Sequence, residues 1–161
     1  MKTLYLLRHA KSSRDNPDLA DRDRPLAAHG EHEAATMGKR WSRRLGKPEL
    51  ILASPALRTH DTARIIAKAF DYKRSKIVLD ERLYATTSEA LIAIVEALDD
   101  KLRRVMIVGH NPELTELARH FDADIVDLRT CALVELVFAV ESWSDLAHTA
   151  PAIVMVDSPK S

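Results

Sequence analysis

Residues 4–13 read LYLLRHAKSS, an apolar run that passes directly into an arginine and a histidine. A short apolar run bounded by polar residues predicts a buried strand, here over residues 3–7. Arg8 carries a permanent charge, and His9 has a side chain whose ordinary pKa lies close to neutrality. Because burying such groups costs free energy, their place at the end of a strand indicates a functional site.

The composition fits one ordinary domain and gives no overall charge on which recognition could depend. The chain has 161 residues, which predicts a single domain over residues 1–161 with its own core. It carries 24 Lys and Arg against 24 Asp and Glu, so the balance predicts no binding to nucleic acid or to an acidic membrane. Any cationic site must therefore be local.

The single cysteine and the hydropathy pattern indicate in which cellular compartment the protein acts. The single cysteine, Cys131, lies in the apolar run CALVELVFAV, so we expect a buried thiol, no internal disulfide and a reducing compartment. The first apolar run ends at Leu7, too short for a signal peptide, and no stretch approaches the ~20 residues of a membrane span. We therefore predict a cytoplasmic protein that does not contact membranes.

Short apolar runs alternate with longer amphipathic patterns along the chain. The runs that predict strands are residues 3–7, 49–53, 76–79, 104–108, 132–140 and 152–156. The patterns that predict helices cover residues 31–45, 54–70 and 88–98. This alternation is typical of an α/β fold with a largely parallel sheet, and the core should lie between the sheet and the helices.

Two other predicted strands end as the first one does. The residues that follow them are Ser54, Pro55 and Arg58 after 49–53, and His110, Asn111 and Pro112 after 104–108. Serine and asparagine suit the N-cap and proline the first helical position, so we expect a helix to begin at each Ser-Pro or Asn-Pro pair. Because the carboxyl ends of parallel strands share one edge, the two arginines and two histidines should converge there.

Such a cluster suits a compact, multiply charged anion. Guanidinium groups match phosphate with paired donors and stabilise the charge that develops during transfer, so a phosphoryl group is the predicted ligand and its transfer the predicted reaction. His9 is the candidate nucleophile, because nearby arginines should depress its pKa and keep the imidazole neutral at pH 7. His110 should hydrogen-bond the phosphoryl oxygens.

Four motifs together resemble a known family. In their order and spacing, LYLLRHAKSS (4–13), SPALRTHDTA (54–63), DERLY (80–84) and VGHNPEL (108–114) are similar to the signatures of the histidine phosphatase superfamily. The RHA variant, RDRPLAAHG (22–30) and GHNPEL most resemble the small SixA-type phosphohistidine phosphatases. The resemblance spans nearly the whole chain. It implies a phosphoglycerate-mutase-like, three-layer α/β/α fold around a mostly parallel sheet, in a minimal version without large insertions.

The resemblance also implies individual roles. His9 would be the phosphorylated nucleophile, Arg8 and Arg58 the phosphate ligands, and His110 the second histidine, with no metal or organic cofactor required. A phosphohistidine-bearing phosphocarrier or phosphotransfer protein would be the substrate. The departures from the family pattern, which bear on substrate details, are Ala10, Arg14 and the His60-Asp61 pair.

Four further residues allow more than one interpretation. Glu81 stands where relatives that act on phosphate esters carry a general acid, but it could instead cap a turn or pair with Arg82. A phosphohistidine substrate needs little such help, since imidazole is a far better leaving group than an alkoxide. Ser12 is a candidate phosphate contact, and Lys11 and Arg24 are candidate substrate contacts. All three could equally be surface residues.

Three functions therefore remain open. The first is a metal-independent phosphatase acting through phosphorylated His9 on phosphohistidine in a protein. The second is a phosphatase of small phosphate esters or sugar phosphates, and the third is a non-catalytic module that binds phosphohistidine. A zinc site is disfavoured, because no third ligand and no H-E-x-x-H pattern accompany the two histidines.

Overall fold

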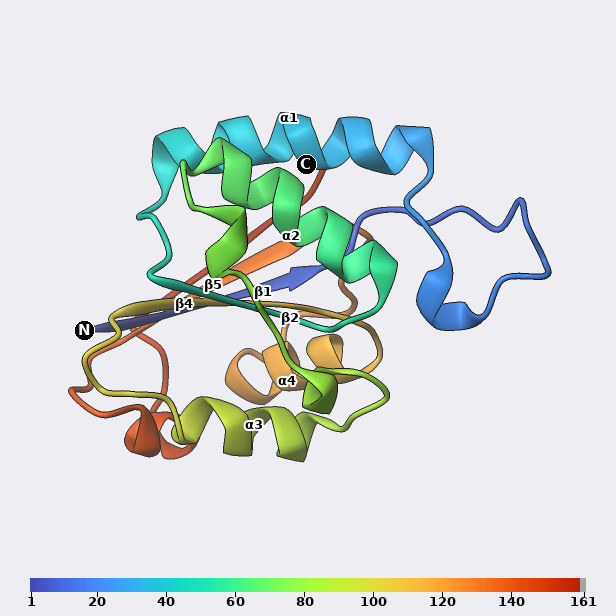
Figure 1. The fold of residues 1–161 in the computed structure, drawn as a ribbon. Coiled ribbons are helices and arrows are strands. Elements are labelled where there is room, and N and C mark those ends of the chain that lie inside the picture. The colour runs from blue at the N-terminus through green and yellow to red at the C-terminus, as the bar shows by residue number, and fades with distance from the viewer. Residues whose placement is uncertain (160–161) are drawn as a thin grey trace.

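In residues 1–159, which this computed structural model describes, six strands form one sheet in the order β3-β2-β4-β1-β5-β6 (Figure 1). Their bounds are β1 Lys2–Arg8, β2 Leu50–Ala53, β3 Val78–Leu79, β4 Arg104–Gly109, β5 Leu133–Phe138 and β6 Ile153–Asp157. The pairs β1–β4, β2–β4 and β2–β3 are parallel, whereas β5 is antiparallel to β1 and to β6. The prediction of a mostly parallel sheet is confirmed.

Helices cover both faces of the sheet, which gives the three predicted layers (Figure 1). The α-helices are α1 Ala28–Arg44 and α2 Leu57–Ala69 on one face, and α3 Ser88–Glu96 and α4 Glu113–Phe121 on the other. The 3-10 helices are η1 Asp21–Asp23, η2 Arg74–Lys76, η3 Glu81–Leu83 and η4 Trp143–His148. None of the helices within residues 1–159 is both long and apolar enough to cross a membrane.

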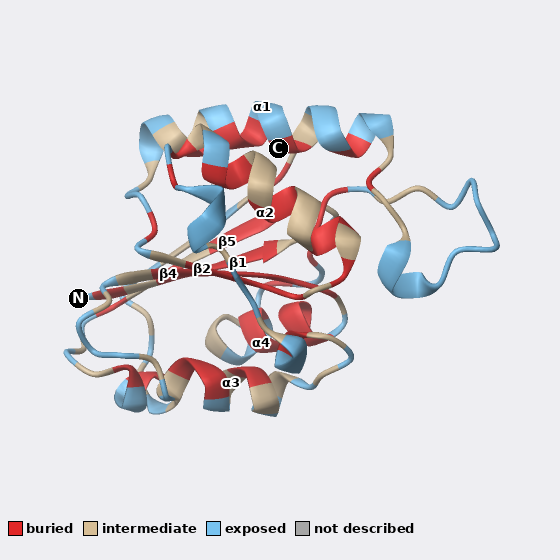
Figure 2. Ribbon diagram, viewed as in Figure 1, coloured by how far each residue is buried: buried red, intermediate tan, exposed pale blue. Residues whose placement is uncertain are grey.

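Strand β1 shows why a continuous apolar run is needed at the centre of this sheet. Tyr5 and Leu7 belong to the core under α1 and α2, while Leu4 and Leu6 belong to the core on the face of α3 and α4. All four side chains are fully buried, and Figure 2 shows buried residues along the central strands and the inner faces of the helices. A strand with two covered faces has no polar side, so its period-2 signal disappears.

The predicted start of α2 is wrong. The helix begins at Leu57, three residues after Ser54, and its cap residue Ala56 makes no side-chain capping hydrogen bond. The Ser54 hydroxyl lies 2.8 Å from Nε2 of His110, and it also accepts a longer hydrogen bond, 3.4 Å, from the backbone N–H of Ala56. The Ser54 side chain thus bonds a residue far along the chain. Sequence rules for helix capping consider only neighbouring residues and cannot predict such a bond.

Helix α4 also begins later than predicted. It starts at Glu113, with Pro112 as its cap residue. Oδ1 of Asn111 nevertheless accepts a hydrogen bond from the backbone N–H of Thr115 at 3.2 Å, so the side chain satisfies one of the free donors of the first turn.

The strand ends that carry the predicted cluster lie at one edge of the sheet. Arg8, at the end of β1, is in register with Gly109, at the end of β4, and His9 donates its backbone N–H to the Gly109 carbonyl at 3.1 Å. The chain then runs from residue 10 to residue 27 as a loop that reaches beyond the sheet before α1 begins (Figure 1). This edge and this loop build the site.

Candidate active site

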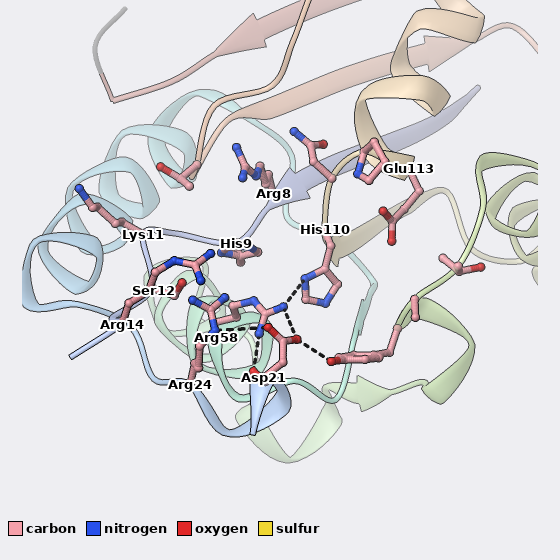
Figure 3. A pocket seen from close by; sticks show the side chains of 16 residues that line it. Arg8, His9, Lys11, Ser12, Arg14, Asp21, Arg24, Arg58, His110 and Glu113 are labelled. Atoms are coloured by element: carbon pink, nitrogen blue, oxygen red, sulfur yellow. Dashed lines mark hydrogen bonds and ion pairs between the residues drawn. The ribbon is translucent and has the colours of Figure 1, made fainter. Parts of the chain in front are cut away.

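A cavity of about 600 Å³ opens at the carboxyl edge of the sheet (Figure 3). Arg8, His9, Arg58 and His110 all line it, although they come from the ends of β1 and β4 and from α2. The two imidazole rings lie with their centroids 5.4 Å apart, tilted by 59°. The structure therefore brings the four predicted side chains together around one space.

His9 presents one particular nitrogen for chemistry. Its Nδ1 lies 2.7 Å from the carbonyl oxygen of Ala10. A carbonyl only accepts hydrogen bonds, so Nδ1 must carry the proton, and Nε2 keeps its lone pair. Only 7% of the residue is exposed. The backbone next to the nucleophile candidate thus fixes both the ring and its tautomer.

Burial, more than charge, keeps His9 neutral. The pKa of His9 is lowered to about 3, mainly by burial; the hydrogen bond to Ala10 opposes this decrease, and His110, Arg58 and Arg8 add to it. The sequence-based expectation that arginines would depress this pKa has the right direction but names the smaller cause. A neutral imidazole at pH 7 has a free electron pair with which to attack phosphorus.

His110 is also neutral and makes two hydrogen bonds. Burial lowers its pKa to about 4, with Arg58 as the next cause. Nδ1 lies 3.4 Å from Nη2 of Arg58, which can only donate, so Nδ1 accepts and Nε2 donates to the Ser54 hydroxyl. The sequence predicts that His110 hydrogen-bonds a phosphoryl oxygen, and Nδ1 could donate such a bond only after gaining a proton.

The two arginines are fixed and retain unused donors. Nη1 of Arg8 donates to the carbonyl of Leu128 at 3.0 Å, and Nη1 of Arg58 donates to the carbonyl of Asp21 at 2.7 Å. Nε of each arginine is buried and has no hydrogen-bond partner within residues 1–159. Buried donors normally have partners, so a group of this kind suits a ligand rich in acceptor oxygens.

Asp21 is a residue of the site that the sequence did not reveal. Its carboxylate accepts hydrogen bonds from Nη2 of Arg58 at 3.0 Å and from the hydroxyl of Tyr84 at 2.5 Å, and it pairs with Nε of Arg24 at 3.3 Å. The bond from Tyr84, followed by those with Arg58, lowers the pKa of Asp21 to about 2. An ionised carboxylate therefore already holds an arginine of the cluster.

The other predicted contacts are divided between cavity and surface. Lys11, Ser12 and Arg24 line the cavity, as does Arg14. Glu81 does not: its exposed carboxylate accepts two hydrogen bonds from Nη2 of Arg22, each 2.8 Å long. Arg82, the other partner considered for Glu81, binds Asp80 instead, at 2.7 Å.

A second carboxyl group, which the sequence reasoning also missed, does line the cavity. Glu113, the first residue of α4, is 5% exposed. In the sequence, the position of Glu113 three residues after His110 could have indicated that it lies near the site. Within residues 1–159, no three His, Cys, Asp or Glu side chains are grouped closely enough to hold a metal ion. The chemistry that these residues offer is nucleophilic attack by an imidazole on an anion held by guanidinium groups.

Comparison with known proteins supports the same chemistry. The family model of the histidine phosphatase superfamily (branch 1) matches residues 4–87. An uncharacterised chloroplastic protein of Arabidopsis thaliana is 31% identical over 152 residues, which cover 89% of this chain and 70% of that protein.

Two solved structures share the fold over most of their length. SixA of Nakamurella multipartitia superposes with a TM-score of 0.84 at 22% identity, covering 99% of this chain and 97% of that one. SixA of Agrobacterium tumefaciens gives a TM-score of 0.77 at 30% identity, covering 84% and 90%. Both are described as candidate phosphohistidine phosphatases.

Proposed function

Because the chain belongs to the histidine phosphatase superfamily and is of the SixA type, we propose that it hydrolyses phosphohistidine in a phosphocarrier or phosphotransfer protein, through a phosphorylated His9. Membership of the superfamily supports phosphatase function. The observation that carries the proposed mechanism is the neutral His9 ring, whose Nδ1 proton is held by the Ala10 carbonyl while Nε2 stays free.

The reaction proceeds in two transfers. Nε2 of His9 attacks the phosphorus atom, the bond from phosphorus to the substrate imidazole breaks, and the departing ring takes up a proton. The phosphorylated His9 ring is cationic while Nδ1 keeps its proton, and the Ala10 carbonyl stabilises that charge. Water then attacks phosphorus, the bond to Nε2 breaks, and inorganic phosphate leaves with His9 neutral again.

Positive charge around the phosphoryl group lowers both barriers. Arg8 and Arg58 hold the equatorial oxygens, on which negative charge develops, with guanidinium donors that are already fixed in place. We expect Nδ1 of His110 to take up a proton when a phosphoryl dianion binds beside it, since a nearby anion favours the charged ring. His110 then donates a hydrogen bond to the phosphoryl group. No step requires a metal ion or an organic cofactor.

A protein substrate suits the rim of the cavity. Lys11 and Arg14 line it and are exposed, so a partner surface that presents a phosphorylated side chain can meet cationic groups at the mouth. The 30% identical Agrobacterium protein is described as a candidate phosphohistidine phosphatase, which favours the same substrate class here. The buried, free Cys131 suits a reducing compartment, and we propose the cytoplasm.

Trapping the phosphorylated enzyme tests the proposal. The wild type is mixed with a phosphocarrier protein carrying radioactive phosphohistidine and quenched within milliseconds. We expect an acid-labile, alkali-stable label on the enzyme, release of phosphate, and loss of both in His9→Ala. His32→Ala is the matched control, because His32 is exposed and does not line the cavity.

Each outcome decides between the open functions. Binding of the phosphocarrier without label or phosphate release would make the protein a non-catalytic binding module. Label on His9 from sugar phosphates, with none from the phosphocarrier, would make it a phosphatase of small esters. Full activity of His9→Ala would remove the mechanism altogether.

A further inference from the structure

Glu113 is a buried carboxyl group on the wall of the cavity, and the mechanism above gives it no task. Figure 3 shows its side chain beside His110, on the same cavity that His9 and Arg58 line. It is the first residue of α4, where the helix N-terminus favours negative charge. The helix N-terminus explains why an acidic residue stands at this position. It does not explain why this residue is buried on the wall of a cavity.

The surroundings of Glu113 differ from those of the other two acidic residues considered. Within residues 1–159 no arginine, lysine or histidine pairs with Glu113, whereas Asp21 is held by Arg58 and Glu81 by Arg22. Backbone N–H groups of Thr86 and of Glu113 itself donate to the carboxylate. Burial outweighs these bonds and raises the pKa of Glu113, so its protonated form persists closer to neutrality.

Phosphate esters require a group of this kind. When Nε2 of His9 attacks an ester, the breaking P–O bond leaves its electron pair on oxygen, and an alkoxide leaves slowly unless it receives a proton. A protonated carboxyl group supplies that proton and becomes a carboxylate. In the second transfer the carboxylate takes a proton from the attacking water, which restores the acid as phosphate leaves.

We propose that Glu113, rather than Glu81, is the proton donor to the leaving group, and that the site therefore also hydrolyses phosphate monoesters with poor leaving groups. The assignment rests on the proposed function, because it uses the same transfer to His9. It rests on position as well: Glu113 lines the cavity and is buried, while Glu81 is exposed and occupied by Arg22. The substrate class thus extends from phosphoramidates to alkyl phosphates.

The test is a leaving-group series on purified wild type, Glu113→Gln and Glu81→Gln. The substrates are a dinitrophenyl phosphate, a phenyl phosphate, an alkyl phosphate and free phosphohistidine, each measured as kcat/KM. For Glu113→Gln we expect losses of about 100-fold or more on the alkyl and phenyl esters, the ordinary range for removal of a general acid. The dinitrophenyl ester and phosphohistidine, which need no proton donor, should lose little.

Glu81→Gln is the matched control and should behave as the wild type on every substrate. The selective pattern within one variant separates lost acid catalysis from lost folding, since a damaged cavity slows all substrates alike. Glu113→Asp, which keeps a carboxyl group, should show the same selectivity with a smaller loss, and it replaces the glutamine variant should that one not fold.

Two results would overturn the assignment. Equal losses of Glu113→Gln on all four substrates would make the residue structural, and selective losses in Glu81→Gln would return the role to Glu81. Failure of this inference is distinguishable from failure of the proposed function. In the first case the quenched enzyme still carries label on His9 from phosphohistidine, and in the second it carries none.

Discussion

Acidification should destabilise the protein through the two histidines of the cavity. The pKa of His9 is lowered to about 3 and that of His110 to about 4, in each case mainly because burial disfavours a charged ring. In the unfolded chain both rings titrate near the ordinary value of 6.5. Below that pH the unfolded state binds more protons than the folded state, so the free energy of unfolding decreases as the pH falls.

The size of the effect follows from these values. The stability that each neutral ring contributes is complete above about pH 6.5 and is lost as the pH falls towards the folded pKa. Between about pH 7 and about pH 5 the loss is about 2 kcal/mol for each histidine, or about 4 kcal/mol for the pair. Arg8 and Arg58 act on both rings in this direction, whereas Asp21 opposes it at His110.

Urea denaturation at the two pH values measures this loss. The His9→Gln, His110→Gln double variant cannot titrate at these positions, so it should lose about 4 kcal/mol less than the wild type, and each single variant about 2 kcal/mol less. His32→Gln, at an exposed position, should match the wild type. Equal losses in the wild type and the double variant would mean that the folded rings titrate normally, and the argument for a neutral nucleophile would then fail.

Two other substitutions test contacts around the site. Asp21→Asn removes the charge that pairs with buried Arg58 at 3.0 Å. Because the Asp21 side chain is 54% exposed, the pair is worth about 0.5–1 kcal/mol, so competitive inhibition by orthovanadate should strengthen about two- to fivefold. Weaker inhibition would make Asp21 a positioning residue. Gly30→Ala places a Cβ 2.2 Å from the backbone oxygen of Lys11 and should cost about 1–3 kcal/mol in urea denaturation. In Gly46→Ala the three atoms nearest to the new Cβ belong to the flexible side chain of Arg104, so a loss as large as that of Gly30→Ala would contradict the packing argument.

The fold could be predicted from the sequence because its signals are local. The strands predicted at residues 3–7 and 104–108 contain continuous apolar runs, and the bounds of β1 and β4 differ from these ranges by at most one residue at each end. The run at residues 76–79 predicts a longer strand than the structure contains. Only Val78–Leu79 pairs as β3, after a 3-10 turn. A two-residue edge strand depends on its partner β2 more than on its own side chains, so sequence pattern alone overstates its length.

The four central residues of the site could be located for a related reason. Arg8 ends β1, and His9 and His110 directly follow β1 and β4. Arg58 lies in the first turn of the helix after β2, so parallel topology alone brings the four residues to one edge. The same reasoning could not predict that burial would dominate the pKa of His9. The burial of the His9 ring depends on how the chain after β1 and the end of β4 pack around it. The sequence of a single segment cannot predict this packing.

The sequence could not predict which carboxyl group lies in the cavity. Glu81 has the better motif, yet Arg22, which lies 59 residues away in the sequence, holds it at the surface. Glu113 lies within the GHNPEL motif, which assigns it no role, yet the start of α4 places it on the cavity wall, where no Lys, Arg or His within residues 1–159 pairs with it. A carboxyl group needs burial without a cation to keep its proton, and only the folded chain decides which glutamate meets both conditions. The acid catalysis proposed for Glu113 therefore depends on long-range pairing. Arg22→Ala, which frees Glu81 without burying it, should not transfer the role to Glu81.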